Sequence, residues 1–225
     1  MPLPHRRRRA RLAAMLVPMR TLIHGLLRML LLWTVAASTA ASMPPDPSNF
    51  VRQLGASLLN EARADGRVAA GDKERVLALV DAKLLPHVDF ARMTAEAVGR
   101  PWREATPAQR QALQQAFKTL LIRTYAGAIA RASDMQWTVF PTRDPNATDL
   151  VVRAELRPEK GEVLNMAYRL NWQADTGWKI YDLNVLGIWL VEVYRGQFAR
   201  PLASGGVAAL IQALEQLNQR AEAAR

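Results

Sequence analysis

The residues of this sequence that could perform acid–base chemistry are few and far apart. Two of the three histidines, His5 and His24, lie within the first 42 residues, so His87 is the one imidazole of the remaining chain. A Ser-His-Asp triad would have to be built on His87, and the sequence has no G-x-S-x-G turn to present a serine. A lone histidine at a predicted helix end is more often a cap or a surface group. The chain also lacks cysteine, which excludes thiol catalysis and thiolate metal sites.

Two carboxylates are the remaining candidates. Asp182 lies in strand sequence between Tyr181 and Leu183, and Asp89 follows the proline that ends a predicted helix. A buried aspartate in a cone-shaped α+β pocket could act as a general base, but it more often accepts hydrogen bonds from backbone N–H groups at a turn or helix start. With no H-E-x-x-H, P-loop or G-x-G-x-x-G motif either, we expect no catalytic residue, no metal and no cofactor.

The aromatic side chains indicate a different chemistry. Beyond residue 42 the sequence holds five tryptophans and four tyrosines: Trp102, Trp137, Trp172, Trp178, Trp189, Tyr125, Tyr168, Tyr181 and Tyr194. Such residues normally form the core. Apolar side chains on both a sheet and a long helix, with no catalytic group between them, are nevertheless what a cavity for a hydrophobic ligand requires.

The stretch 168–198 must position many of these side chains. Tyr168, Leu170 and Trp172 alternate with polar residues, the period of two that is typical of a half-buried strand. Residues 175–177 supply turn chemistry, and a second strand follows. Gly187 ends that strand, and the apolar spacing then lengthens to a helical stripe that begins at residue 188.

Capping signals divide the rest of the chain into helices. Asp46 with Pro47 predicts a helix start, and Thr106 with Gln109 forms a capping box in sequence. We predict helices over 47–64, 72–85, 90–98, 107–132 and 207–221, the last introduced by a glycine pair. Strands are predicted from 135, 150, 163 and 178, joined by short hairpins. The fold class is α+β, an antiparallel four-stranded sheet that packs with several helices and encloses an apolar cavity.

Residues 1–42 have the pattern of an export signal. A basic segment at 20–28 precedes an apolar run at 29–37, and small residues then predict cleavage after Ala40, Ala41 or Ser42. The apolar run is shorter than the roughly 20 residues that span a bilayer. A membrane anchor that is retained in the mature protein is the alternative interpretation. A start at Met19 would make residues 1–18 an artefact of start-codon choice. We expect residues 43–225 to form one domain in the periplasm.

The net charge of +10 belongs largely to this signal. Residues 1–42 hold seven arginines and no acid, which leaves 23 basic and 20 acidic side chains, a net charge of +3, for residues 43–225. This gives little electrostatic drive for phosphate binding, so we expect no nucleic-acid partner.

Several motifs in order resemble those of one known family. The segments 178–183 and 194–198, with Gly187 and Gly205, look like the C-terminal signature of MlaC-type periplasmic phospholipid-binding proteins, also called toluene-tolerance auxiliary proteins. The likeness extends back through 85–90, Gly99 with Trp102, and 106–125, and covers roughly residues 47–217.

The resemblance implies a carrier that moves phospholipid between the outer and inner membranes and so maintains the lipid asymmetry of the outer membrane. Its implied partners are phospholipid, an inner-membrane ABC transporter complex and an outer-membrane lipoprotein–porin complex. One departure is visible: Leu186 and Trp189 stand where the family commonly has an acidic or polar residue and a serine. The alternative function is a periplasmic enzyme that uses Asp182.

The candidate lipid contacts come from the long helix, the sheet and the start of the following helix. They are Phe117, Leu121, Tyr125, Ala128, Ile129, Leu164, Met166, Tyr168, Leu170, Ile188 and Trp189.

Overall fold

The computed structural model describes residues 44–223, so the predicted signal at 1–42 lies outside the described residues. The first half of the described chain is helical: α2 (Pro47–Ala64), α3 (Gly66–Ala69), α4 (Lys73–Lys83), the 3-10 turn η1 (Leu85–His87), α5 (Phe90–Val98), α6 (Pro101–Glu104) and α7 (Pro107–Ala132). The sheet and a final helix follow as β1 (Gln136–Val139), β2 (Asp149–Arg157), β3 (Leu164–Gln173), β4 (Gly177–Val185), β5 (Ile188–Trp189) and α8 (Leu190–Ala223).

Side-chain caps begin the helices where the sequence predicts them. The Asp46 carboxylate accepts a hydrogen bond from Ser48 N at 2.9 Å. At α7 the Thr106 hydroxyl accepts from Gln109 N at 3.2 Å, and the Gln109 side chain accepts from Thr106 N at 2.9 Å. Both contacts satisfy N–H groups that the first helical turn leaves free. The predicted helices 47–64, 90–98 and 107–132 are confirmed.

Two short helices and one boundary differ from the prediction. The helix predicted over 72–85 ends at Lys83, and the chain continues as the 3-10 turn η1. Pro86 has no backbone N–H to donate to residue 82, so the α-helix does not continue through it. Asp65 ends α2 and caps the unpredicted α3, and α6 begins at Pro101. Helices of one turn leave too little periodicity to be seen in sequence.

The sheet has five antiparallel strands in the order β1-β2-β3-β4-β5. The four-strand prediction missed β5, in which Ile188 pairs with Val185 and Trp189 with Asn184. Helix α8 therefore begins at Leu190, and the prediction that Ile188 opens a helix is wrong. The β3–β4 turn is as predicted, with Gly177 at a φ of +77°.

A break divides α8 where the sequence places a glycine pair. Gly206 has φ +63° and ψ −151°, a combination open essentially to glycine alone, and Gly205 is also non-helical. Two helical arms thus meet at this pair, which agrees with the predicted last helix after residue 206.

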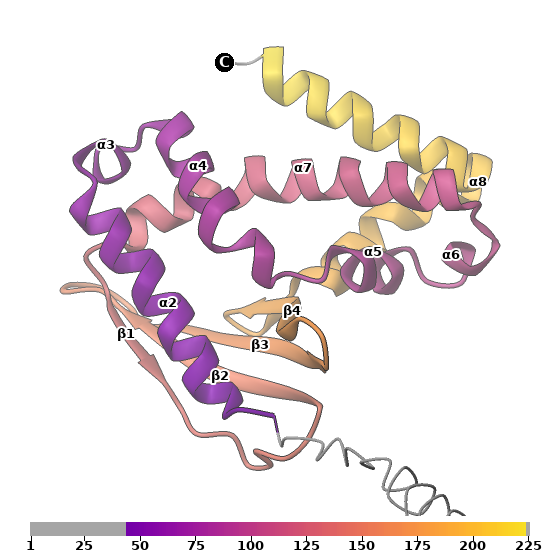
Figure 1. The fold of residues 1–225 in the computed structure, drawn as a ribbon. Helices are drawn as coiled ribbons and strands as arrows, with labels where there is room; N and C mark the ends of the chain where they lie inside the picture. The colour runs from indigo at the N-terminus through magenta and orange to yellow at the C-terminus, as the bar shows by residue number, and fades with distance from the viewer. Residues whose placement is uncertain (1–43, 224–225) are drawn as a thin grey trace, which may run out of the picture. The chain divides into compact units, whose positions relative to one another are not determined.

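The described residues form four apolar clusters, of which one holds the sheet against α2 and another joins three helices. Helix α2 lies across one face of the sheet (Figure 1), where Val51 packs with Val152 and Leu170; we call this the inner face. A second cluster joins α5, α7 and α8, and there the ring of Phe117 meets those of Tyr194 and Phe198 at centroid distances of 4.8 and 5.2 Å. Within residues 44–223, no helix combines the length and apolar character needed to cross a membrane.

Candidate functional site

The predicted sheet contacts share the inner face. Leu164, Met166, Tyr168 and Leu170 alternate along β3 and lie opposite apolar residues of β2. Leu170 is fully buried against α2, whereas the other three are only partly buried. The inner face is therefore closed near Leu170 and more open toward the start of β3.

The predicted helix contacts are not all buried. Phe117 and Leu121 belong to the α5–α7–α8 core, and Ile129 packs beside the separate cluster of α2, α3, α4 and α7. Tyr125 is 39% exposed and Ala128 is exposed as well. The predicted residues thus belong to different clusters, and the structure does not gather them into one.

One stripe of α7 has an unusual burial pattern. Residues at steps of four, three and four lie on one helix face, so Leu121, Tyr125, Ala128 and Ala132 form what we call the α7 stripe. Leu121 is buried in the helical core, and Ala132 is buried with Leu156 of the sheet. Tyr125 and Ala128, between them, are exposed. The stripe is closed at both ends and open in the middle.

The tyrosines around this region carry neutral hydroxyls. The Tyr168 hydroxyl lies 3.8 Å from the Met166 sulfur, and burial raises the pKa of Tyr168 above its ordinary value. Burial, with a smaller contribution from a hydrogen bond to Tyr125, also raises the pKa of Tyr194. These groups add polarity to the apolar surroundings without adding charge.

Trp137 is a residue of the inner face whose role the sequence did not reveal. Its indole packs edge-on to Tyr168 at a centroid distance of 6.2 Å, and Gly55 of α2 lies directly on it. The Trp137 Nε1–H is buried and has no hydrogen-bond partner among the described residues. In sequence Trp137 counted only as one of several core aromatics, because nothing local marks an unpaired donor.

Asp182 has the contacts of a structural carboxylate. It is fully buried, and its Oδ1 accepts from Leu183 N at 2.8 Å and from Val191 N at 3.0 Å. Its Oδ2 accepts from Arg169 Nη1 at 2.8 Å. Burial raises the pKa of Asp182, and these N–H donors and the guanidinium oppose the rise. The prediction that Asp182 accepts from a backbone N–H at a helix start is confirmed, because Val191 lies in the first turn of α8.

The other two candidates for acid–base chemistry also serve local structure. Asp89 caps α5 by accepting from Arg92 N at 2.8 Å, and it accepts from Gln173 Nε2 at 2.9 Å. His87 packs its ring against Phe50, and burial, followed by the nearby Lys179 charge, lowers the pKa of His87. Within residues 44–223 no hydrogen bond joins His87, Asp89 and Asp182, and no cluster of three potential metal ligands occurs.

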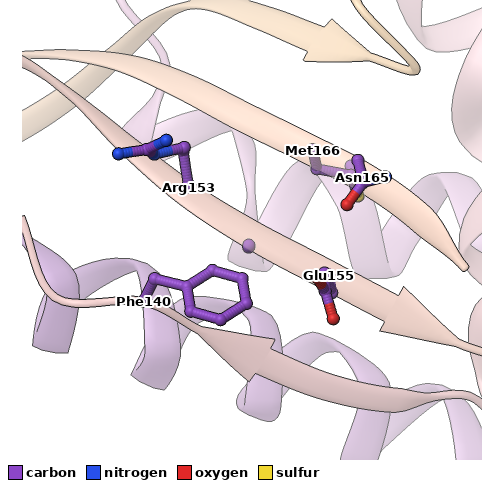
Figure 2. Close-up of a pocket in the computed structure, with 6 residues that line it drawn as sticks. Phe140, Arg153, Glu155, Asn165 and Met166 are labelled. Atoms are coloured by element: carbon purple, nitrogen blue, oxygen red, sulfur yellow. The ribbon is translucent and has the colours of Figure 1, made fainter.

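Two surface hollows lie away from the α7 stripe. One, of about 380 Å³, is lined by Phe140, Arg153, Ala154, Glu155, Asn165 and Met166 (Figure 2). The other, of about 520 Å³, follows α8 and is lined by Gln197, Arg200, Pro201, Ser204, Ala209, Gln212, Ala213, Gln216, Leu217 and Arg220. Charged and amide groups contribute to both linings, and Met166 is the one predicted contact among them. Both linings therefore mix apolar with charged and amide groups.

Comparison with known proteins gives three similarities. The family model described as MlaC protein matches residues 52–216. Toluene tolerance protein ttg2D of Pseudomonas putida is 26% identical over 176 residues, which cover 78% of this chain and 78% of that protein. A solved structure, of the phospholipid-binding protein from Ralstonia solanacearum in complex with a phospholipid, has a TM-score of 0.74 and 38% identity, and the match covers 79% of this chain and 99% of that one.

Proposed function

The chain belongs to the MlaC family, and we propose that it binds phospholipid and carries it between membranes. The observation that carries this proposal is the α7 stripe, which is apolar, closed at both ends and open at Tyr125 and Ala128. The Ralstonia solanacearum protein, whose structure contains a phospholipid, supports the choice of ligand.

The binding site would lie between the α7 stripe and the open part of the sheet's inner face. Met166 and Tyr168 are partly buried there, so an acyl chain could cover apolar surface that the protein itself leaves accessible. Each methylene that leaves water contributes about 0.8 kcal/mol. The hydroxyls of Tyr168 and Tyr194 stay neutral, so these two side chains add no charge to the site. Trp189 pairs with Asn184 on the opposite face of the sheet, under Arg169, and so lies outside this site. We retain the other ten predicted contacts as candidates, with Phe117 and Leu170 as supporting core.

The Trp137 indole would add a polar contact to this site. Its Nε1–H is a buried donor without a partner among the described residues, and an unmade hydrogen bond of that kind is costly. An ester carbonyl of a bound phospholipid is an acceptor that could satisfy it. The ring's edge-on packing against Tyr168 places it beside the predicted sheet contacts.

The resemblance and the N-terminal sequence support a more specific proposal about where the protein acts and with which partners. We propose that residues 1–42 are removed on export and that the mature domain acts in the periplasm. There it would move phospholipid between the outer and inner membranes to maintain outer-membrane asymmetry. Its partners would be an inner-membrane ABC transporter complex and an outer-membrane lipoprotein–porin complex.

Native mass spectrometry of the protein purified from a periplasmic fraction tests the proposal. We expect adducts whose masses match phospholipids, and organic extraction of the same sample should yield those lipids. The Ralstonia solanacearum protein, prepared in parallel, is the positive control. Lipid adducts on the control together with none on this protein would contradict the proposal.

A further inference from the structure

The turn between β4 and β5 breaks a local rule of backbone geometry. Leu186 has φ +53° and Gly187 φ +88°, and these two residues connect the opposed pair Val185 and Ile188. Two-residue hairpins with positive φ at both positions favour Asn-Gly, because asparagine tolerates the left-handed region and leucine does not. Leu186 is the one non-glycine residue with positive φ in the described part of the chain.

The same turn also exposes apolar surface. Leu186 is 57% exposed and Ile188 is 60% exposed, the two highest values among the large apolar side chains of residues 44–223. An asparagine at 186 would relieve the strain and hydrate better. Strain and apolar exposure at the same two-residue turn indicate a function for these side chains.

Order within the turn is secured by hydrogen bonds. Leu186 N donates to Asn165 O at 2.9 Å, and Gly187 N donates to Asn184 Oδ1 at 2.9 Å. Trp189, two residues after Gly187, has the Arg169 guanidinium over its ring, 4.0 Å from the ring centroid. The turn is therefore held in place from both sides, and the two aliphatic side chains are presented to solvent in a fixed geometry.

An apolar row leads from this turn into the core. Directly opposed residues of antiparallel strands put their side chains on the same face. The opposed residues across the five strands are Ile188, Val185, Met166, Ala154 and Val139, which we call the apolar row. Burial increases along it, from the exposed Ile188 through the partly buried Val185 and Met166 to Ala154, which is 2% exposed.

We propose that Leu186 and Ile188 form the entry lip of the phospholipid site, where the end of an acyl chain first contacts the protein. From there the chain slides along the apolar row to the inner face beside Met166. A row that leads from exposed through partly buried to buried side chains fits a flexible hydrocarbon chain that must pass inward, whereas a bilayer or a protein partner would need only the exposed end. This inference rests on the proposed function. It assigns the lip to a turn in which Leu186 stands where the family commonly has an acidic or polar residue.

The rate of lipid uptake tests this inference. The double variant Leu186→Asn, Ile188→Thr removes the apolar lip and keeps the turn, and Leu217→Gln is the control, since Leu217 is a 44% exposed side chain on α8 and outside the apolar row. Delipidated proteins are mixed with vesicles of phosphatidylethanolamine and phosphatidylglycerol in equal amounts, with a trace of fluorescent phospholipid. We expect uptake by the double variant to slow about fourfold or more, the factor that corresponds to one buried methylene, with the final bound amount retained.

The outcomes separate this inference from the proposed function. An uptake rate in the double variant equal to that of the unaltered protein would overturn the entry lip, as would an equal slowing by Leu217→Gln. No uptake by the unaltered protein would instead contradict the proposed function. Leu186→Asn alone should raise the melting temperature, because asparagine tolerates the left-handed backbone, and this shows that slower uptake does not come from misfolding.

Discussion

Asp182 shows how one side chain can fix the junction of three elements. From within β4 it accepts from the first turn of α8, through Val191 N, and pairs with Arg169 of β3. Arg169 in turn covers Trp189 of β5. A buried carboxylate is costly unless its oxygens are satisfied, and here the contacts supply three donors.

Asp182→Asn should lower the free energy of unfolding by about 1–3 kcal/mol, because the shape stays but Arg169 loses its charged partner. This loss of stability is smaller than that expected for a fully buried ion pair, since the Arg169 side chain is 31% exposed. The matched control is Glu155→Gln, which breaks a surface pair with Arg157 at 3.3 Å and should change stability by less than about 0.5 kcal/mol. Urea unfolding measures both.

Equal stability of these two variants would contradict the structural role of Asp182. Phospholipid loading of Asp182→Asn should survive at the level of the unaltered protein. If loading survives but turnover of a small molecule by the purified protein disappears, Asp182 is instead a catalytic base.

Single residues were predictable where their role is local. Asp89 could be interpreted as an acceptor for backbone donors because it stands at an element boundary in sequence. For Asp182, which lies inside β4, only the general preference of buried aspartates for such donors supported the same interpretation. The role of Trp137 could not be predicted, since its unpaired Nε1–H results from the approach of α2, an element far away in the chain.

Helix α2 owes its close fit on the sheet to a missing side chain. A Cβ on Gly55 would lie 2.4 Å from Trp137 Nε1 and 2.5 Å from Trp137 Cε2. The indole is itself packed against Tyr168, so it cannot move aside freely. Glycine inside a helix is otherwise unfavourable relative to alanine, which indicates that contact with the sheet outweighs helix propensity at this position.

Gly55→Ala should therefore destabilise the fold, by about 1–3 kcal/mol through overpacking, less the helix propensity it gains. Gly127→Ala is the matched control in α7, because its Cβ would meet only the flexible Arg131 Nη1, at 3.4 Å. That change should stabilise by about 0.5–1 kcal/mol. Thermal melts should thus shift in opposite directions, and a rise for both variants would show that α2 does not pack on Trp137 as described.

Elements were predictable in proportion to their length and caps. The capping residues Thr106, Pro107 and Gln109 predict the helix 107–132, and the structure has the same bounds. Strand β5 was not predicted, because a strand of two residues shows no periodicity. In addition, the turn before it has Leu186 where a hairpin of this type normally has asparagine. Leu186 thus made the turn hard to predict, and the same side chain is part of the proposed entry lip.

At the scale of the molecule, α7 links the cluster of α5, α7 and α8 to a cluster that includes the sheet. One end of the α7 stripe is buried among helices and the other against the sheet, and Figure 1 shows this helix running beside α8 above the strands. The sequence could predict both apolar surfaces. It could not predict their separation, because the same residue types line a filled core and a ligand cavity. In the structure Leu121 and Ala132 are buried and Ala128 is exposed, so the stripe is not packed as one continuous core.

The phospholipid content of Ala128→Trp tests the central claim, that a lipid lies between α7 and the sheet. The indole should occupy space that an acyl chain needs, and because Ala128 is exposed the substitution should cost little stability. Ala199→Trp, at an exposed alanine of α8, is the matched control. We predict that Ala128→Trp co-purifies with much less phospholipid than Ala199→Trp and that its delipidated form keeps the melting temperature of the unaltered protein. A large fall in melting temperature with normal phospholipid content would contradict the account.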